Sequence, residues 1–217
     1  MVAFDDGDEE LFPISPHKMG PPPKNSAIEG RANPKGIPYL YLSTNEDTAI
    51  AEKRPWIGAE VTLGYFEILE DLNIVDTSTD KPKNPLTKFN KHFEIRSVES
   101  YSDAEKEEYI WGDINYAFSK PISANESTLK YLPTQFLSEK LKTIGYDGIA
   151  YKSSLREDGH NICLFYPDKA KCFGCNIFTI NKIKYEYEKL GNSIKLSEDN
   201  KVLYSRITDI KPIEPEK

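Results

Sequence analysis

The chain has 217 residues, of which 38% are hydrophobic and 12% aromatic, and its formal net charge is −7. This composition supports one large domain with a buried core, and it disfavours direct nucleic-acid binding because no dense basic segment is present. No segment approaches the roughly 20 apolar residues of a membrane helix, and the acidic start lacks the features of a secretory signal. Three cysteines cannot all pair with one another, which favours a reducing, cytoplasmic compartment.

The composition of the N-terminal residues 1–24 predicts an irregular arm. Acidic residues give way to Pro13 and Pro16 and then to three consecutive prolines at 21–23. Proline has no backbone N–H and a fixed φ, so this segment suits neither a regular helix nor a central strand. We expect an extended arm that lies over the domain.

Regular structure is predicted from about residue 37. Residues 37–42 are apolar and aromatic, as in a buried strand. Ser43 and Glu46 match a capping box, which predicts a helix starting there, and Pro55 should end it. Residues 60–68 alternate between apolar and polar, the pattern of a half-buried strand.

The middle of the chain predicts a short strand, a loop and two helices. Residues 72–75 suit a short strand, and residues 77–100 are polar and rich in Lys, Asn and Pro, as in a loop. Apolar residues at helical spacing predict a helix over residues 103–118. A second helix should begin near Pro133 and end at Gly145.

Strands dominate the last third of the chain. Residues 148–151 and 161–166 predict two strands joined by a polar loop, and the alternation over residues 182–188 predicts a late, half-exposed strand. The element order mixes α and β without regular βαβ repeats. We therefore predict an α+β domain with a mostly antiparallel sheet.

Three residue types in the first folded segment suggest a chemistry. Arg31 lies in a turn bounded by glycine and proline, Tyr41 on the next strand, and Glu52 on the following helix. A guanidinium can bind phosphate, a tyrosine ring can stack on a base, and a carboxylate can stabilise a developing cation. These groups could hold a dinucleotide and break an N-glycosidic bond, although the residue types alone allow other sites.

Spacing and order add a family resemblance. The motif residues are Gly30-Arg31-x-Asn33-x-x-Gly36, Tyr41, Thr48-Ala49-x-x-Glu52, Gly145-Tyr146-Asp147-Gly148, Ser153 and Asn161. Over about residues 20–170 the sequence resembles the RES family, named for Arg, Glu and Ser. The resemblance implies a fold like that of ADP-ribosyltransferase toxins, with a split sheet and flanking helices. It also implies degradation of NAD⁺, by hydrolysis or phosphorolysis, with NAD⁺ as substrate and no bound cofactor.

The resemblance assigns a role to each matching residue. Arg31 should bind the NAD⁺ phosphates or the nicotinamide ribose, and Tyr41 should pack on the nicotinamide. Glu52 should be the catalytic carboxylate, and Ser153 should orient the ribose. Asn161 matches a family asparagine that we expect to bind substrate or support the site.

The resemblance also suggests a division of the chain and a partner. We expect the arm over residues 1–24, a RES catalytic domain over 25–170, and an extension over 171–217 that packs on that domain or continues it. The implied partner is a cognate antitoxin protein whose C-terminal part fills the NAD⁺ site, with the arm and the extension as contact surfaces. No direct nucleic-acid or membrane partner is expected, and a homo-oligomer is left open.

Several alternatives stay open at the level of sequence. The same pocket could transfer ADP-ribose to a protein or nucleic acid, or it could bind a nucleotide without catalysis. Ser154 is adjacent to Ser153, so the motif serine could shift by one position. Cys172 and Cys175 have the spacing of a zinc or redox pair, but the remaining Cys and His residues form no second pair, so no metal site is predicted.

Overall fold

We analysed the protein as a computed structural model. The structure describes residues 2–4, 12–78, 102–120, 128–187, 193–196 and 202–205. The chain separates into two compact units, Met1–Asn181 and Lys182–Lys217. No helix among the described residues combines the length and the apolar character that crossing a bilayer requires.

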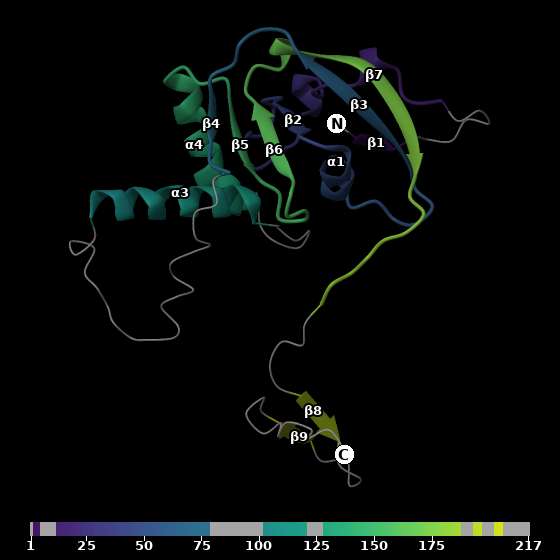
Figure 1. The fold of residues 1–217 in the computed structure, drawn as a ribbon, viewed down its shortest axis with the longest axis vertical. Helices are drawn as coiled ribbons and strands as arrows, with labels where there is room; N and C mark the ends of the chain where they lie inside the picture. The colour runs from purple at the N-terminus through teal and green to yellow at the C-terminus, as the bar shows by residue number, and fades with distance from the viewer. Residues whose placement is uncertain are drawn as a thin grey trace. The chain divides into compact units, whose positions relative to one another are not determined.

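A four-stranded sheet forms the centre of the first unit (Figure 1). Its strands lie in the order β2 (Leu40–Ser43), β6 (His160–Leu164), β5 (Gly148–Lys152) and β4 (Ile74–Asp76). The pair β4–β5 is parallel, and the other two pairs are antiparallel. The first half of the chain thus supplies both edge strands, and β5 and β6 pair between them.

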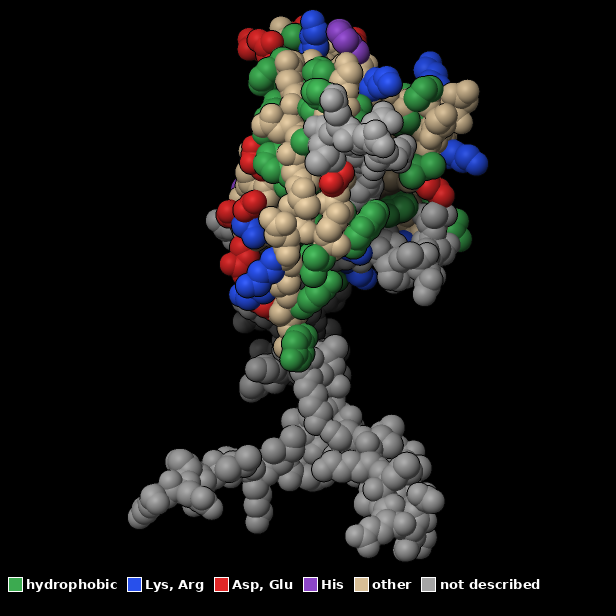
Figure 2. Space-filling model, turned by 90° about the vertical axis from the view of Figure 1, so that its right-hand side faces the viewer, with side chains coloured by type: hydrophobic (Ala, Val, Ile, Leu, Met, Phe, Trp, Pro, Cys, Tyr) green, Lys and Arg blue, Asp and Glu red, His purple; other side chains and the backbone are tan. Residues whose placement is uncertain are grey.

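A second sheet contains three antiparallel strands, β1 (Val2–Phe4), β3 (Glu60–Ile68) and β7 (Ala170–Thr179), with β3 in the middle. The β3–β7 register shifts between Tyr65 and Phe66, which leaves one extra residue on β7. Phe173 is 67% exposed at this shift. Figure 2 shows hydrophobic side chains at the surface on this side of the molecule.

Three α-helices lie within the described part of the first unit: α1 (Glu46–Lys53), α3 (Asp103–Ser119) and α4 (Leu132–Thr143). Both α3 and α4 pack against β5, and they lie beside the β4–β5 side of the four-stranded sheet (Figure 1). Helix α1 contacts both β2 and β3, so it connects the two sheets. Short 3₁₀ turns occur at η1 (Pro16–Lys18), η2 (Lys24–Ser26), η4 (Thr128–Tyr131) and η5 (Pro167–Lys169).

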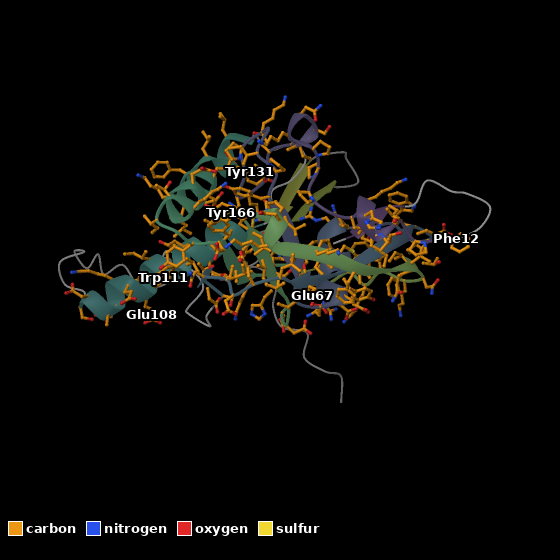
Figure 3. The ribbon with its side chains drawn as sticks, turned by 90° about the horizontal axis from the view of Figure 1, so that it is seen from above. Phe12, Glu67, Glu108, Trp111, Tyr131 and Tyr166 are labelled. Atoms are coloured by element: carbon orange, nitrogen blue, oxygen red, sulfur yellow. The ribbon has the colours of Figure 1, made fainter. Side chains whose placement is uncertain are left out.

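The main core lies between the four-stranded sheet and the two longer helices. Its fully buried side chains include Phe118 from α3, Ile149 from β5, and Cys163 and Phe165 from β6 and the residue after it. Trp111, which Figure 3 labels on α3, is partly buried against the same cluster. This core fixes β5 and β6, and β6 carries Asn161, one of the predicted site residues.

The predicted fold class is confirmed: the domain is α+β, with its strands split between two mostly antiparallel sheets and helices beside them. The strand over 60–68 and the helix over 103–118 lie where the patterns predicted. Most of the loop predicted over 77–100 falls outside the described residues.

Three local predictions are wrong. The arm over residues 1–24 is not irregular throughout, because Val2–Phe4 form β1 and pair antiparallel with β3. Helix α1 is capped by Asn45, whose side-chain oxygen accepts from the N–H of Thr48 at 2.8 Å, and not by a Ser43–Glu46 capping box. Ser43 is instead the last residue of β2. The strand predicted over 182–188 is absent from the described residues 182–187, where Tyr187 is 94% exposed and pairs with none of the described strands.

The structure also shows how the chain continues after residue 170. The whole of β7 pairs with β3, so residues 170–179 form an edge strand of the three-stranded sheet and belong to the first unit. The second unit contains the hairpin of β8 (Ser193–Leu196) and β9 (Val202–Ser205), which pair antiparallel. The expected extension over 171–217 therefore begins within a strand of the domain and ends in a separate unit.

Candidate active site

A cavity of about 630 Å³ opens beside β2 and α1. It is bounded by the N-terminal arm, the turn that follows the arm, strand β2, helix α1, and single residues of β5 and β6. This volume falls in the range of roughly 300–1,000 Å³ that is typical of small-molecule sites. Of the predicted site residues, Tyr41, Glu52 and Asn161 line the cavity.

Glu52 is held at one carboxylate oxygen. Its Oε1 accepts a hydrogen bond from the Oγ of Ser153 at 2.7 Å and another from the Nδ2 of Asn161 at 2.7 Å. Within the described residues, Oε2 has no hydrogen-bond partner. Two neutral donors fix the orientation of the carboxylate without cancelling its charge, so the group can still act on a ligand in the cavity.

A further hydrogen bond orients Asn161. Its Oδ1 accepts from the Oγ of Ser43 at 2.7 Å, and this fixes the amide with its Nδ2 toward Glu52. Ser43 and Asn161 are register partners in the β2–β6 ladder, so strand pairing places the two side chains together. Ser43 is a site residue that the sequence analysis missed, because its spacing to Glu46 was interpreted as a helix cap.

The serine next to Glu52 is Ser153. It is buried, it donates to Glu52, and its Oγ also accepts from the N–H of Leu155 at 3.1 Å. Ser154 is exposed and makes no side-chain hydrogen bond within the described residues. The geometry therefore places Ser153, and not its neighbour, beside the carboxylate.

The turn over residues 30–36, which we call the arginine turn, is fixed by its asparagine. The buried Asn33 donates to the carbonyl oxygens of Ile28 and Ile37, each at 2.9 Å, and its Oδ1 accepts from the hydroxyl of Tyr41 at 2.7 Å. A Cβ at Gly30 would lie 2.7 Å from that Oδ1, so glycine is required for this close approach.

Helix α4 supports the same turn from behind. The buried Gln135 donates from Nε2 to the carbonyl oxygens of Gly30 at 2.9 Å and of Asn33 at 3.1 Å. No sequence pattern indicates a role for Gln135, because a polar residue on an amphipathic helix ordinarily lies at the surface. Its apolar neighbour Phe136 is 66% exposed, so on this part of α4 the polar side chain is buried and the aromatic one is not.

Arg31 takes a position different from the other motif residues. Its Nη1 donates to the carbonyl oxygens of Phe118, at 2.6 Å, and of Lys120, both at the C-terminal end of α3. Arg31 does not line the cavity. It satisfies carbonyls that the end of a helix leaves without partners, and it ties the arginine turn to α3.

The charges of Arg31 and Glu52 both act on the hydroxyl of Tyr151 on β5. Tyr151 lines the cavity and is buried. Burial is the main reason that the pKa of its hydroxyl is raised far above the usual value, and the charge of Arg31 opposes this rise. Burial also raises the pKa of Tyr41 well above its ordinary value. Both phenols therefore stay protonated at neutral pH and can act as hydrogen-bond donors but not as bases.

Metal-binding groups do not cluster in the described part of the chain, where no three His, Cys, Asp or Glu side chains come together. The sulfur atoms of Cys172 and Cys175 lie 3.7 Å apart on β7, and both cysteines are free thiols. The pair is separate from Glu52 and its hydrogen-bond partners.

Comparison with known protein families identifies the chain. The model of the RES domain family matches residues 12–179. The chain belongs to the RES domain family. Searches of curated proteins and of solved structures found no match.

The RES domain is longer than the resemblance over residues 20–170 suggested. It takes in the arm from residue 12 and the whole of β7. Membership of the family supports a toxin-type function in general terms, and all the residues that surround Glu52 lie inside the matched segment.

Proposed function

We propose that this RES-domain protein degrades NAD⁺ by breaking the bond between nicotinamide and ribose. The observation that carries the proposal is the carboxylate of Glu52, which is fixed at one oxygen by Ser153 and Asn161 in the wall of a cavity large enough for a nucleotide. A fixed negative charge is the group that a reaction through a ribosyl cation requires.

In the proposed reaction, the C1′–N bond breaks heterolytically. Its electron pair leaves with nicotinamide, which becomes neutral, and positive charge develops on C1′ and the ring oxygen of the ribose. Oε2 of Glu52 stabilises this charge from the cavity wall. Water then forms a bond to C1′ and releases a proton to solvent, which yields ADP-ribose, or inorganic phosphate forms the bond through an anionic oxygen, which yields the 1″-phosphate.

The surrounding residues keep Glu52 in position during this step. Because Oε1 is occupied by two donors, the carboxylate cannot rotate toward solvent without losing both hydrogen bonds. Tyr41 presents its ring in the cavity wall while its hydroxyl is held by Asn33, which suits stacking on nicotinamide. We assign Arg31 a positioning role, since its guanidinium binds the end of α3.

The test is release of nicotinamide from NAD⁺ by the purified protein, with and without phosphate. Glu52→Gln keeps the shape of the side chain and removes its charge, and we expect kcat to fall by roughly 100- to 1,000-fold. The matched control is Glu67→Gln on β3, a glutamate that does not line the cavity and that Figure 3 labels. This variant should keep full activity.

Two outcomes would overturn the proposal. In the first, folded wild-type protein releases no nicotinamide under either condition. In the second, labelled ADP-ribose accumulates on a protein or nucleic acid instead of in solution, which would assign ADP-ribosyl transfer. If nicotinamide release depends on phosphate, then phosphate is the nucleophile.

The proposal includes the antitoxin implied by the family resemblance. A peptide segment that occupies the 630 Å³ cavity would exclude NAD⁺ from Glu52. Inhibition by such a partner should therefore be competitive with NAD⁺, which steady-state kinetics at several NAD⁺ concentrations can establish.

A further inference from the structure

The N-terminal arm forms a wall of the cavity. Lys18, Gly20 and the three prolines at 21–23 all line it. The arm is tied to the three-stranded sheet where the N–H of Ile14 donates to the Oγ1 of the buried Thr62 at 3.1 Å. The arm is therefore part of the structure of the site.

Met19 anchors the arm next to Lys18. Its side chain is buried, and its terminal methyl group lies over Gly64 of β3, where an added Cβ would come within 2.9 Å of it. A second cavity of about 230 Å³ is lined by Met19, Gly20 and Pro21, and the last two residues also line the larger cavity. The arm thus separates the two cavities, and the buried Met19 fixes the backbone position of the adjacent Lys18.

The charges around the larger cavity come from four side chains. Two are the carboxylates of Glu29 and Glu52, and two are the ammonium groups of Lys18 and Lys53. Lys18 comes from the arm, and Lys53 is the last residue of α1, directly after Glu52. Both lysines are exposed, and neither has a salt bridge or side-chain hydrogen bond within the described residues.

To bind a dinucleotide, the larger cavity needs positive charge near the diphosphate. Its diphosphate carries two negative charges, which the two carboxylates of the cavity would repel. Arg31, the expected phosphate ligand, binds carbonyl oxygens of α3 and does not reach the cavity lining. Lys18 and Lys53 are the cations that the described lining supplies.

We infer that Lys18 and Lys53 bind the diphosphate of the substrate from two walls of the cavity, one formed by the arm and one by α1. The inference rests on the proposed function and specifies its substrate class. It makes the enzyme selective for nicotinamide dinucleotides over nicotinamide riboside, which contains the same glycosidic bond but no phosphate. Ammonium groups serve this purpose because they bind phosphate as point charges without a demanding geometry.

The kinetic test compares these two substrates. Lys18→Ala combined with Lys53→Ala should lower kcat/KM for NAD⁺ by roughly 10-fold for each lysine, mostly through KM. The value of kcat/KM for nicotinamide riboside should stay within about 2-fold of wild type, because no phosphate contact is lost. Lys24→Ala, an exposed lysine of the same arm outside the lining, is the matched control.

Binding of ADP-ribose gives a readout that does not depend on turnover. By calorimetry, the double variant should bind ADP-ribose roughly 100-fold more weakly than wild type, and the affinity of wild type should fall as salt is raised. If NAD⁺ is not cleaved but ADP-ribose binding depends on the two lysines, the inference stands and the proposed function fails. If the double variant binds ADP-ribose like wild type, or if both substrates lose activity equally, the inference is wrong.

Discussion

Replacing Gly159 with alanine puts a methyl group into space that Thr48 of α1 already fills. A Cβ at residue 159 would lie 2.0 Å from the Oγ1 of Thr48 and 2.8 Å from its Cγ2. Ordinary contacts between such atoms are about 3.5–4.0 Å, and Thr48 is fully buried, so the helix or the loop must move. Gly159 accepts a hydrogen bond from the N–H of Ser153 at 2.8 Å, which means that movement disturbs the partner of Glu52.

The magnitude follows from this overlap. Overpacking a buried position costs about 1–3 kcal/mol, and a contact of 2.0 Å places Gly159→Ala near the upper end. For a domain of this size, about 3 kcal/mol corresponds to a fall in Tm of roughly 6–12 °C. Urea and thermal unfolding followed by circular dichroism measure both quantities, and nicotinamide release by the folded fraction should fall as well.

A double variant separates this cause from a general effect of the loop. Thr48→Ala removes the two closest atoms, and the Oγ1 that it deletes has no hydrogen-bond partner. Alone it should change the free energy of unfolding by no more than about 1 kcal/mol. Combined with Gly159→Ala it should restore about half of the loss, since the Cβ of residue 48 stays 2.9 Å away. Purely additive effects would refute the reasoning.

Three further predictions test the support of the site and the ionisable groups around it. Gln135→Leu leaves two carbonyl oxygens of the arginine turn without their donor and should destabilise the protein by about 1–3 kcal/mol in urea unfolding; a loss below 0.5 kcal/mol would contradict this support. The pKa of Asp147 is lowered, first by a backbone hydrogen bond and then by Lys169, so its contribution to stability is present above about pH 4 and is lost as pH falls through the folded-state value. Asp147→Asn should therefore flatten the acid limb of a curve of unfolding free energy against pH. An unchanged limb would show that the Asp147 carboxylate does not contribute to stability. Partial burial, followed by the neighbouring Cys172, raises the pKa of Cys175 to about 11. Its alkylation by iodoacetamide at pH 8 should therefore be roughly 100-fold slower than that of a free thiol, and an equal rate would show that the pKa of this thiol is not raised.

Hydrophobic patterns located the elements of this fold that pack on a core, although residues 61–64 of β3 are buried on both faces and not on one face, as the alternation predicted. The strand over 60–68 and the helix over 103–118 were found because their apolar spacing reflects packing on a core. The strand over 182–188 was predicted from the same alternation, but an alternating sequence forms a strand only where another strand pairs with it. Tyr185 and Tyr187 are accordingly 78% and 94% exposed.

The candidate site was predicted in part, because family motifs report residue identities and not their contacts. The motif singled out Glu52, Ser153 and Asn161, and the structure brings their side chains within hydrogen-bonding distance. Ser43 and Gln135 could not be found this way, because their roles depend on the β2–β6 register and on which face of α4 meets the arginine turn. Both are long-range facts that a local pattern does not contain.

The hydrogen bonds to Glu52 join parts of the chain that are far apart in sequence. Ser153 follows it by 101 residues and Asn161 by 109 residues. During synthesis the glutamate therefore leaves the ribosome long before its partners, and the carboxylate stays unanchored until β6 has emerged and paired with β2. A nascent or truncated chain that ends before β6 lacks an organised site, so the activity proposed for this domain begins only when nearly all of it has been made.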